Sequence, residues 1–378
     1  MSYIDYTKSK LKNRVLQIDR HIDRYRDNKI NTIFNHKWFI NNDIINSVGK
    51  HMLDHIREHN TRPAKRLRAS LLYYTYQMFT KDPDYKVIQS IQELSISLEL
   101  IHTWLLIHDD YQDQDELRRW VVTTHKYYEQ YAKDNSLALD HSHFGSGMAI
   151  NAWDIVLTLW YQQVLKVNID SENKMKLLDI LFDGIIQTAF GQSLDLMLEG
   201  MESVNQDTIL WVQNSKTGIY TYQTPILMWA IITWVDDRIK NILSKYAIYC
   251  GIAFQIQDDI LGVFGDPSTT GKSDYNDIIK WKKTLLYLKT LELVWDEDRQ
   301  FFVDHYGKAG ITIEQSEKIK SIIISCGAYQ ANLDLAGKYA KKALATIKLI
   351  ENSWVYYDID SYHYFIGIAE YMWATRDK

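Results

Sequence analysis

Proline and glycine, the two residues that interrupt helices most strongly, are scarce along this chain. Its 378 residues include only four prolines and 16 glycines. A helix interior tolerates neither residue well, so long stretches without them favour helices over short strands joined by turns. We therefore predict an all-α fold, built as a large helical bundle.

No break in composition divides the chain into parts. It contains no linker rich in Gly or Ser, no internal repeat and no low-complexity segment. A length of 378 residues would accommodate two domains. The missing linker favours one helical body, and we predict a single domain over residues 1–378.

Charge and cysteine content exclude several classes of protein. The net charge of −5 gives no support for a nucleic-acid surface. Cys250 and Cys326 are too few and too far apart for a disulfide framework or a cysteine metal site. The N-terminus lacks the apolar core of a signal peptide, and the longest apolar run, residues 226–235, is about half the length of a membrane span. We expect a cytoplasmic protein without a membrane span or a nucleic-acid partner.

Residues 84–113 show the clearest helical periodicity. Apolar side chains recur there at spacings of three and four residues, which predicts one helix with an apolar face. The residues of this face are Ile91, Leu94, Leu98, Ile101 and Leu105, followed by His108.

Five carboxylates within eight residues close this predicted helix, and two arginines follow them. Residues 107–120 read IHDDYQDQDELRRW. On a helical wheel Asp113 lies about 40° from Asp109, and His102 lies about 20° from it. A divalent cation would remove the repulsion between carboxylates one turn apart, and ligation by oxygen alone suits Mg²⁺. Taken by itself, the segment is more typical of a solvated helix end.

A second pair of aspartates makes the solvated interpretation less attractive. Residues 251–266 read GIAFQIQDDILGVFGD, so Asp258 and Asp259 also end an apolar helical stretch. Two such pairs predict several Mg²⁺ ions. Mg²⁺ bound by a few carboxylates normally completes its shell with water and substrate phosphates.

Basic residues near both acidic segments would bind such phosphates. Arginine suits bidentate contacts with phosphate, and lysine supplies a point charge. Each of these residues, taken singly, is more typical of an ordinary surface position. No glycine-rich phosphate loop is present, so dinucleotide or P-loop binding has no support. The candidates are Lys65, Arg66, Arg68, Arg118, Arg119, Lys216, Lys272, Lys282 and Lys283.

The order of these motifs resembles that of the trans-isoprenyl diphosphate synthases, the family of farnesyl and geranylgeranyl diphosphate synthases. AKRLR (64–68) is similar to the family's GKRxRP motif, and residues 99–119 are similar to its first aspartate-rich region. The remaining motifs follow in the family's order: HFGSGMAINAWD (143–154), FGQSLDL (190–196), KTG (216–218), FQIQDDILGVFGD (254–266) and GKSDYNDIIKWKKT (271–284).

The resemblance implies a helical bundle around a central cavity, the isoprenoid synthase fold, and a homodimer. It implies three Mg²⁺ ions per active site, bound by Asp109, Asp113 and Asp258, with Asp110 outside the direct ligand set. The implied ligands of the allylic diphosphate are Arg118, Gln192, Lys216, Lys272 and Lys282, with Asp195 beside them. Those of isopentenyl diphosphate are Lys65, Arg68, His102 and Arg119.

The implied reaction condenses isopentenyl diphosphate with dimethylallyl, geranyl or farnesyl diphosphate. Charge on the departing diphosphate is stabilised by Mg²⁺ and basic residues, and the allylic cation is attacked by the alkene. Thr217, Tyr220 and Gln255 match positions that flank this cation, and Lys216 lies beside them in the sequence. We expect a short-chain product, C15 to C20, with a slight preference for geranylgeranyl diphosphate.

Two other activities use similar residues. A class I terpene cyclase also needs an acidic cluster and Mg²⁺, but it binds one diphosphate and would not need the AKRLR site. A non-catalytic subunit of a hetero-oligomeric synthase usually lacks one acidic cluster, whereas both are present here.

Several positions depart from the family pattern. Trp120 and Trp281 stand where small residues are usual, and they raise a question about loop closure and substrate range. Trp104 and Leu105 occupy the positions that limit product length in the family. On the helical wheel Leu105 lies near the Asp109 face, whereas Trp104 lies about 140° from it. In the family the growing product extends from the metal site into an apolar channel, and the two residues suggest different positions for the closed end, or floor, of this channel.

Overall fold

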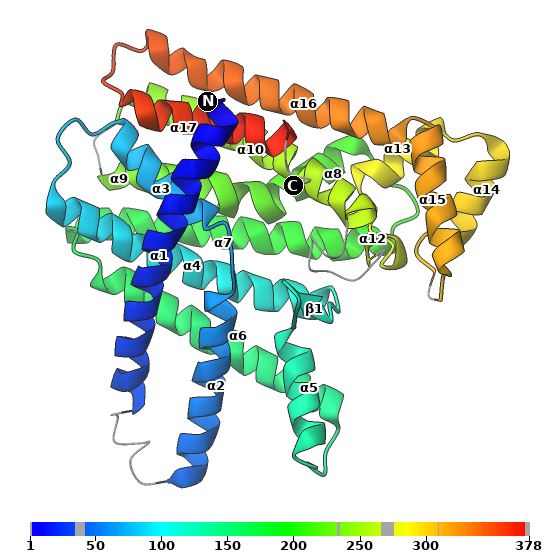
Figure 1. The fold of residues 1–378 in the computed structure, drawn as a ribbon, viewed down its shortest axis with the longest axis horizontal. Coiled ribbons are helices and arrows are strands. Elements are labelled where there is room, and N and C mark those ends of the chain that lie inside the picture. The colour runs from blue at the N-terminus through cyan, green and yellow to red at the C-terminus, as the bar shows by residue number, and fades with distance from the viewer. Residues whose placement is uncertain (1, 35–41, 233–234, 266–275, 309, 375–378) are drawn as a thin grey trace. The chain divides into compact units, whose positions relative to one another are not determined.

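The computed structural model describes residues 2–34, 42–232, 235–265, 276–308 and 310–374 (Figure 1). Helices account for nearly all regular structure in these ranges, together with one two-stranded sheet. The all-α prediction is therefore confirmed. Lys272 lies outside the described residues. Contacts group the chain into two compact units. The single-domain assignment stays a prediction.

The smaller unit contains residues 8–73 and 82–174. It holds most of the first helix, α1 (Tyr3–Phe34), and the first part of α3 (Leu67–Met78). Its other elements are α2 (Asp43–Thr61), α4 (Tyr85–Gln112), β1 (Leu117–Arg118), β2 (Val121–Val122), α5 (Thr124–Asp134) and α6 (His141–Lys166). Helices α5 and α6 cross closely at Gly145, where an added Cβ would lie 2.3 Å from the carbonyl oxygen of His125.

The helix predicted over residues 84–113 is confirmed as α4. Asp84 caps its N-terminus by accepting a 2.7 Å hydrogen bond from the backbone N–H of Lys86. Asp113 is the C-cap residue, and its N–H donates to the carbonyl oxygen of Asp109 at 2.8 Å. The first acidic cluster therefore lies at the C-terminal end of α4, where the helix dipole favours cations.

A short hairpin follows α4, and the sequence did not predict it. Strands β1 and β2 are antiparallel, with Arg118 opposite Val121. The loop consists of Arg119 and Trp120, whose φ angles are 54° and 63°. Two-residue hairpin loops need positive φ at both positions and usually contain Asn or Gly. Here an arginine and a tryptophan adopt this conformation, at a cost on the order of 1–2 kcal/mol each.

The larger unit contains residues 2–7, 74–81 and 175–374 of the described chain. In it α16 packs on both α10 and α17 (Figure 1). Its elements are most of α7 (Ser171–Gly200), α8 (Gln206–Gln213), the π-helix η1 (Asn214–Gln223), α9 (Thr224–Ile232), α10 (Asp237–Phe264), α12 (Asn276–Ile279), α13 (Leu285–Leu293), α14 (Asp296–His305), α15 (Ile313–Ser325), α16 (Ala328–Ile347), the 3-10 helix η2 (Lys348–Asn352) and α17 (Ile359–Ala374).

Helix α10 is the core helix of the larger unit. Its buried residues include Tyr246, Ala253 and Ile256. Among the described residues, α10 is also the one helix that is long and apolar enough to cross a membrane by length and composition. Its most apolar window is 56% buried inside the structure, and buried core helices pass the same test.

Candidate active site

The candidate active-site residues fall into one group in each unit. In the smaller unit, the three aspartates at the end of α4 differ in exposure. The side chain of Asp109 is 25% exposed and that of Asp110 only 1% exposed. Asp113 is half-buried. Asp109 and Asp113 therefore present carboxylates one turn apart, whereas Asp110 is buried. Its place outside the metal ligands stays a prediction.

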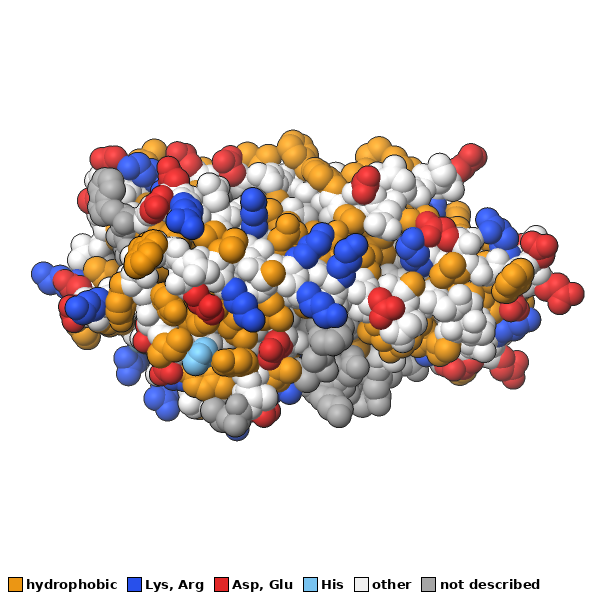
Figure 2. Space-filling model, turned by 90° about the horizontal axis from the view of Figure 1, so that it is seen from above, with side chains coloured by type: hydrophobic (Ala, Val, Ile, Leu, Met, Phe, Trp, Pro, Cys, Tyr) orange, Lys and Arg blue, Asp and Glu red, His pale blue; other side chains and the backbone are white. Residues whose placement is uncertain are grey.

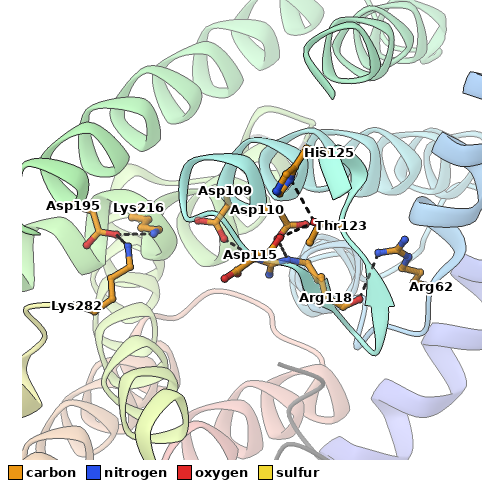
Figure 3. Close-up of polar contacts among 10 residues, drawn as sticks. All are labelled: Arg62, Asp109, Asp110, Asp115, Arg118, Thr123, His125, Asp195, Lys216 and Lys282. Atoms are coloured by element: carbon orange, nitrogen blue, oxygen red, sulfur yellow. Dashed lines mark hydrogen bonds and ion pairs between the residues drawn. The ribbon is translucent and has the colours of Figure 1, made fainter. Parts of the chain in front are cut away.

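Arg118, on β1, binds the carboxylates around it (Figure 3). Its Nη2 lies 2.8 Å from Oδ2 of Asp109 and 3.6 Å from Oδ2 of Asp115, and its Nε donates to Asp110. Burial raises the pKa of Asp110 to about 6, although the Arg118 guanidinium opposes this shift. Burial alone would lower the pKa of Arg118, but the three carboxylates outweigh it and hold the pKa above its usual value.

A cluster of cations surrounds His102, on α4. Burial lowers the pKa of His102 well below its usual value, and Arg68, Arg119, Arg66 and Arg118 lower it further. The pKa of Arg119 falls to about 10, because its guanidinium is buried and lies near Arg118, Arg66 and Arg68. Like charges held together in this way favour the binding of an anion, since the anion relieves their repulsion.

Within the AKRLR motif the three basic side chains have different surroundings. Lys65 is exposed, and Arg68 is 9% exposed in the first turn of α3. Arg66, with φ of 46°, is buried and forms ion pairs with Glu99 at 2.7 Å and Asp19 at 2.9 Å. Arg66 is therefore a structural residue. Lys65 and Arg68 stay predicted ligands of isopentenyl diphosphate.

Arg62 was not singled out from the sequence, yet it connects α2 to the hairpin (Figure 3). Its side chain is 3% exposed, and its Nη2 lies 2.8 Å from the Glu58 carboxylate. The same guanidinium donates to the backbone carbonyl oxygens of Val122 at 3.2 Å and Arg118 at 3.5 Å. Backbone acceptors leave no sequence pattern, so no signal in the chain would have identified this role.

In the larger unit, Asp195 on α7 accepts from two lysines (Figure 3). Lys216 lies 2.8 Å and Lys282 3.3 Å from its Oδ2, and Lys282 also pairs with Glu199 at 2.9 Å. Burial alone would raise the pKa of Asp195, but the two lysines outweigh it and lower the pKa. The structure thus brings together Asp195, Lys216 and Lys282, although Asp195 and Lys282 are 87 positions apart in the sequence.

Close backbone contacts explain the glycines in these motifs. A Cβ added to Gly191 would lie 2.6 Å from the backbone nitrogen of Lys216, so glycine lets α7 approach η1. A Cβ on Gly251 would lie 2.6 Å from Cα of Gly218, where α10 crosses η1. Lys216 and Gly218, the η1 residues of these two contacts, lie in a π-helix, a form often found at functional sites. It carries Lys216, Thr217 and Tyr220, all half-buried.

The two aspartates of the second cluster also differ in exposure. Asp258 is exposed, whereas Asp259 is 8% exposed. Asp259 accepts hydrogen bonds from the side-chain amides of Gln213 at 2.7 Å and Gln255 at 2.9 Å. Asp258 is thus the accessible carboxylate of the pair, and Asp259 fixes the amide plane of Gln255. Gln192 is half-buried on α7.

Trp281, like Trp120, has a left-handed backbone, with φ of 55°. A Cβ added to Gly307 would overlap the Trp281 ring at 2.2 Å, so the indole packs directly against that glycine. The Lys283 ammonium lies 4.7 Å from the centre of the indole ring. The tryptophans before Lys282 and after Arg119 are therefore accommodated in strained turns.

Trp104 lies in an aromatic stack within the smaller unit. Its ring centre is 4.6 Å from that of His108, which stacks on Trp153 of α6 at 4.0 Å. Leu105 is half-buried one position further along α4. Neither contact assigns a floor to the product channel, and both chain-length positions stay predictions.

The residues at the end of α4 fit Mg²⁺. Among the described residues, no group of three or more His, Cys, Asp and Glu side chains is arranged to hold a metal ion. Mg²⁺ is usually bound by one or two carboxylates together with water and substrate phosphates. Asp109 and Asp113 supply such a pair, at a helix end that favours cations.

Comparison with known proteins identifies the class to which this fold and these residues belong. The polyprenyl synthetase family matches residues 50–323, which is most of the chain. The chain belongs to the polyprenyl synthetase family, and it is a prenyltransferase.

Individual relatives carry related names. The chain is 29% identical over 291 residues to the geranylgeranyl diphosphate synthase of Saccharolobus solfataricus, covering 77% of this chain and 81% of the relative. It is 31% identical over 253 residues to the geranylfarnesyl diphosphate synthase of Aeropyrum pernix, covering 66% and 73%.

Solved structures support the fold. A geranylgeranyl pyrophosphate synthase from Corynebacterium glutamicum, solved with isoprenyl diphosphate and magnesium, matches with a TM-score of 0.84 at 23% identity over the whole of both chains. A geranylgeranyl pyrophosphate synthetase from Pyrococcus horikoshii matches with a TM-score of 0.73 at 22% identity, covering 96% of this chain and all of that one.

Proposed function

We propose that this chain condenses isopentenyl diphosphate with an allylic diphosphate and releases a short-chain trans-prenyl diphosphate, C15 to C20, and diphosphate. The observation that carries the proposal is that each unit gathers cations of its own. In the smaller unit the charges of Arg68 and Arg119, both assigned to isopentenyl diphosphate, help to lower the pKa of His102. In the larger unit Lys216 and Lys282 converge on Asp195. Two anion-binding groups suit two diphosphates, whereas a terpene cyclase needs only one.

Asp109, Asp113 and Asp258 would hold Mg²⁺, three ions per active site by analogy with the family. When bound, Mg²⁺ supplies positive charge against the diphosphate that leaves the allylic substrate. The relative from C. glutamicum was solved with magnesium, which agrees with this assignment. Arg118 contacts the same carboxylate as the proposed metal, so we propose that it exchanges between Asp109 and the allylic diphosphate while Asp110 and Asp115 retain it.

The remaining residues act without a covalent intermediate. Arg68, Arg119, Lys65 and neutral His102 bind the diphosphate of isopentenyl diphosphate, with His102 donating a ring N–H. Lys216, Lys282, Gln192 and Lys272 bind the allylic diphosphate.

The allylic carbon–oxygen bond breaks, the alkene attacks the cation, and the proton that is then lost goes to the released diphosphate. Thr217, Tyr220 and the carbonyl oxygen of Gln255 direct their dipoles at the cation, and the apolar surroundings exclude water that would quench it.

We also propose a homodimer that uses α7. Four large apolar side chains of this helix are exposed: Met175 (61%), Ile186 (51%), Phe190 (61%) and Met197 (60%). At about 100° per residue they lie within an arc of roughly 60°, so they form one apolar line along the helix. A second copy of the chain would cover this line. Phe190→Glu should therefore yield monomers in equilibrium sedimentation, whereas Ile313→Glu, at an exposed position on α15 outside this line, should not.

One incubation tests the proposed activity. The protein is supplied with Mg²⁺, isopentenyl diphosphate and, in separate reactions, dimethylallyl, geranyl or farnesyl diphosphate, and the products are sized. We expect linear C15 to C20 diphosphates, with C20 favoured, and loss of turnover in excess chelator that added Mg²⁺ restores. Cyclic hydrocarbon from one substrate would instead support a terpene cyclase. No turnover with any primer would support a non-catalytic subunit. The proposed cytoplasmic location is tested separately by cell fractionation.

A further inference from the structure

The C-terminal half of α16 exposes lysines on one side and contains no acidic residue, although Asp334 is exposed one turn before Lys338. Residues 335–350 contain four lysines and no Asp or Glu, although 48 of the 378 residues in the chain are acidic and about two would be expected in a segment of this length. Lys338, Lys341, Lys342 and Lys348 are all exposed. At about 100° per residue the three lysines within α16 span an arc of roughly 100°, so they project from one face.

Figure 2 shows the molecule from above, where Lys and Arg side chains lie among hydrophobic ones together with some Asp and Glu side chains. The opposite face of α16 is buried and packs on α10 and α17 through small residues such as Ala336, Ala340 and Ala343. The ammonium of Lys342 lies 4.8 Å from the ring centre of Tyr339, which restrains it at the surface. The lysine face is thus fixed on a rigid helix.

Exposed apolar side chains follow the lysine face directly. Trp354 is 100% exposed, and Leu349 and Ile359 are each 51% exposed. Tyr356 is 47% exposed. Trp354 also has φ of 60°, a conformation that costs a tryptophan on the order of 1–2 kcal/mol. The folded chain therefore exposes this indole fully to solvent although its backbone is strained. Trp354 lies six residues after Lys348.

We propose that this surface, Lys338 to Ile359, docks on a lipid bilayer that carries anionic headgroups. Lysines attract an anionic membrane surface, and tryptophan and tyrosine favour the boundary between headgroups and acyl chains. The exposed aliphatic residues, Leu349 and Ile359, suit acyl chains better than they suit nucleic-acid bases. The segment contains no arginine for bidentate contacts with phosphate. The positive lysines match anionic headgroups, and the exposed apolar side chains that follow them match acyl chains. Both features therefore favour a membrane over a nucleic acid.

The nearest acidic groups limit this attraction without cancelling it. Asp334 precedes the lysines on the same helix and accepts from Gln330 at 2.9 Å. After them, Glu351 accepts from the Tyr362 hydroxyl, and Asp358 accepts from the Ser361 hydroxyl at 2.7 Å. Asp360 follows Ile359 and is exposed. Neutral hydrogen-bond donors leave the charge of a carboxylate in place, but within Lys338 to Ile359 the four lysines outnumber the two carboxylates, Glu351 and Asp358, so this segment keeps a net positive charge.

Docking does not depend on the proposed enzymatic activity. It concerns a surface of the larger unit that holds none of the proposed ligands of Mg²⁺ or diphosphate. If the product is a prenyl diphosphate, the same surface would bring the enzyme close to the phase into which an apolar tail partitions. A failure of docking and a failure of catalysis are therefore separately observable.

Sedimentation with phospholipid vesicles tests the proposal. The full-length protein is mixed with vesicles of phosphatidylcholine alone or of phosphatidylcholine with phosphatidylglycerol. We expect binding to the anionic vesicles that weakens as salt increases, and at least tenfold weaker binding for the double variant Lys338→Ala/Lys341→Ala. Trp354→Ala should also weaken binding at least threefold. Prenyltransferase activity with soluble substrates should be unchanged in both variants.

Two matched variants serve as controls. Trp295 is 84% exposed but precedes three acidic residues, Asp296, Glu297 and Asp298, so Trp295→Ala should bind vesicles like the wild type. Lys12→Ala/Lys50→Ala removes the same charge from exposed positions in the smaller unit and should also have little effect. Equal losses in test and control variants, or no binding to anionic vesicles, would overturn the proposal. Release of bound vesicles by double-stranded DNA, with the lysine variants losing DNA binding, would reassign the surface to nucleic acid.

Discussion

Arg62 donates a hydrogen bond from Nη2 to the backbone carbonyl oxygen of Val122 at 3.2 Å. With its contact to the carbonyl oxygen of Arg118, this fastens both strands of the hairpin to the C-terminal end of α2. The hairpin carries Arg118 and Arg119, which the proposed function assigns to the two diphosphates. Arg62 is therefore a positioning residue that acts through the hairpin backbone.

Arg62→Ala should lower the free energy of unfolding by on the order of 1–3 kcal/mol, because it leaves two part-buried carbonyl groups and Glu58 without their donor. It should also raise KM for isopentenyl diphosphate more than it lowers kcat, since Arg119 would be misplaced. Thermal denaturation and initial rates measure these effects. Arg57→Ala removes an exposed arginine from the same helix, paired with Asp27 at 3.7 Å, and should change stability by less than about 0.5 kcal/mol. Equal effects of the two substitutions would show that Arg62 has no special role.

The accessible carboxylates should dominate catalysis. Asp109→Ala and Asp258→Ala should each lower kcat by at least about 100-fold, on the order of 3 kcal/mol of transition-state stabilisation. Asp134→Ala, at an exposed position on α5, serves as the control. Steady-state rates at saturating Mg²⁺ give kcat for each variant and for the wild type. A mild loss in either test variant would mean that its aspartate lies on a solvated helix end.

The two diphosphate sites should respond separately to substitution. Arg68→Ala and His102→Ala should raise KM for isopentenyl diphosphate several-fold more than KM for the allylic substrate. Lys216→Ala and Lys272→Ala should have the opposite preference, because these lysines are assigned to the allylic diphosphate. Kinetics with each substrate varied in turn would reveal the split. Four variants with the same effect on both substrates would contradict the assignment.

Product length should depend on the aromatic stack at Trp104. If Trp104 forms the floor of the product channel, Trp104→Ala should lengthen the product by at least one C5 unit when farnesyl diphosphate is the primer. Trp153→Ala should act in the same direction, because its ring holds His108 against Trp104. Leu105→Ala tests the other candidate position, and Tyr161→Ala, 37% exposed on α6, is the control. Unchanged product length in all three test variants would place the floor on another helix.

Acid should destabilise the smaller unit through His55, on α2. Burial lowers the pKa of His55 to about 3, assisted by Arg62 and His51. The unfolded chain binds this proton below about pH 6.5, whereas the folded chain does not until about pH 3, so stability falls with decreasing pH across that interval, by roughly 1.4 kcal/mol per pH unit.

Unfolding by denaturant at pH 7 and pH 5 measures this slope. His55 Nε2 lies 3.2 Å from the Thr124 hydroxyl, a contact that glutamine can preserve. His55→Gln should therefore reduce the dependence of stability on pH, whereas His143→Gln, at an exposed position on α6, should retain the slope of the wild type. An identical slope in His55→Gln would exclude this histidine as the cause.

The sequence by itself determined the helical fold class, the helix over residues 84–113 and the family. Local physics explains this success. Apolar spacing of three and four residues fixes a helix and its buried face, and scarce proline and glycine leave few alternatives. The motif order also identified the pairs at Asp109 and Asp258, because paired acidic residues after apolar stretches are conspicuous in a linear chain. The second pair does not end its helix as expected, since α10 continues to Phe264.

Only the tertiary structure decided which members of those pairs are accessible and which residues hold them. Asp110 and Asp259 are buried, and their partners Arg118 and Gln213 come from other elements. The hairpin at Arg119 and Trp120 contains none of the usual turn residues, and Arg62 reaches it through backbone acceptors about 60 residues away. Burial and hydrogen bonding between distant segments depend on how helices pack in three dimensions, and no periodicity along the chain records them.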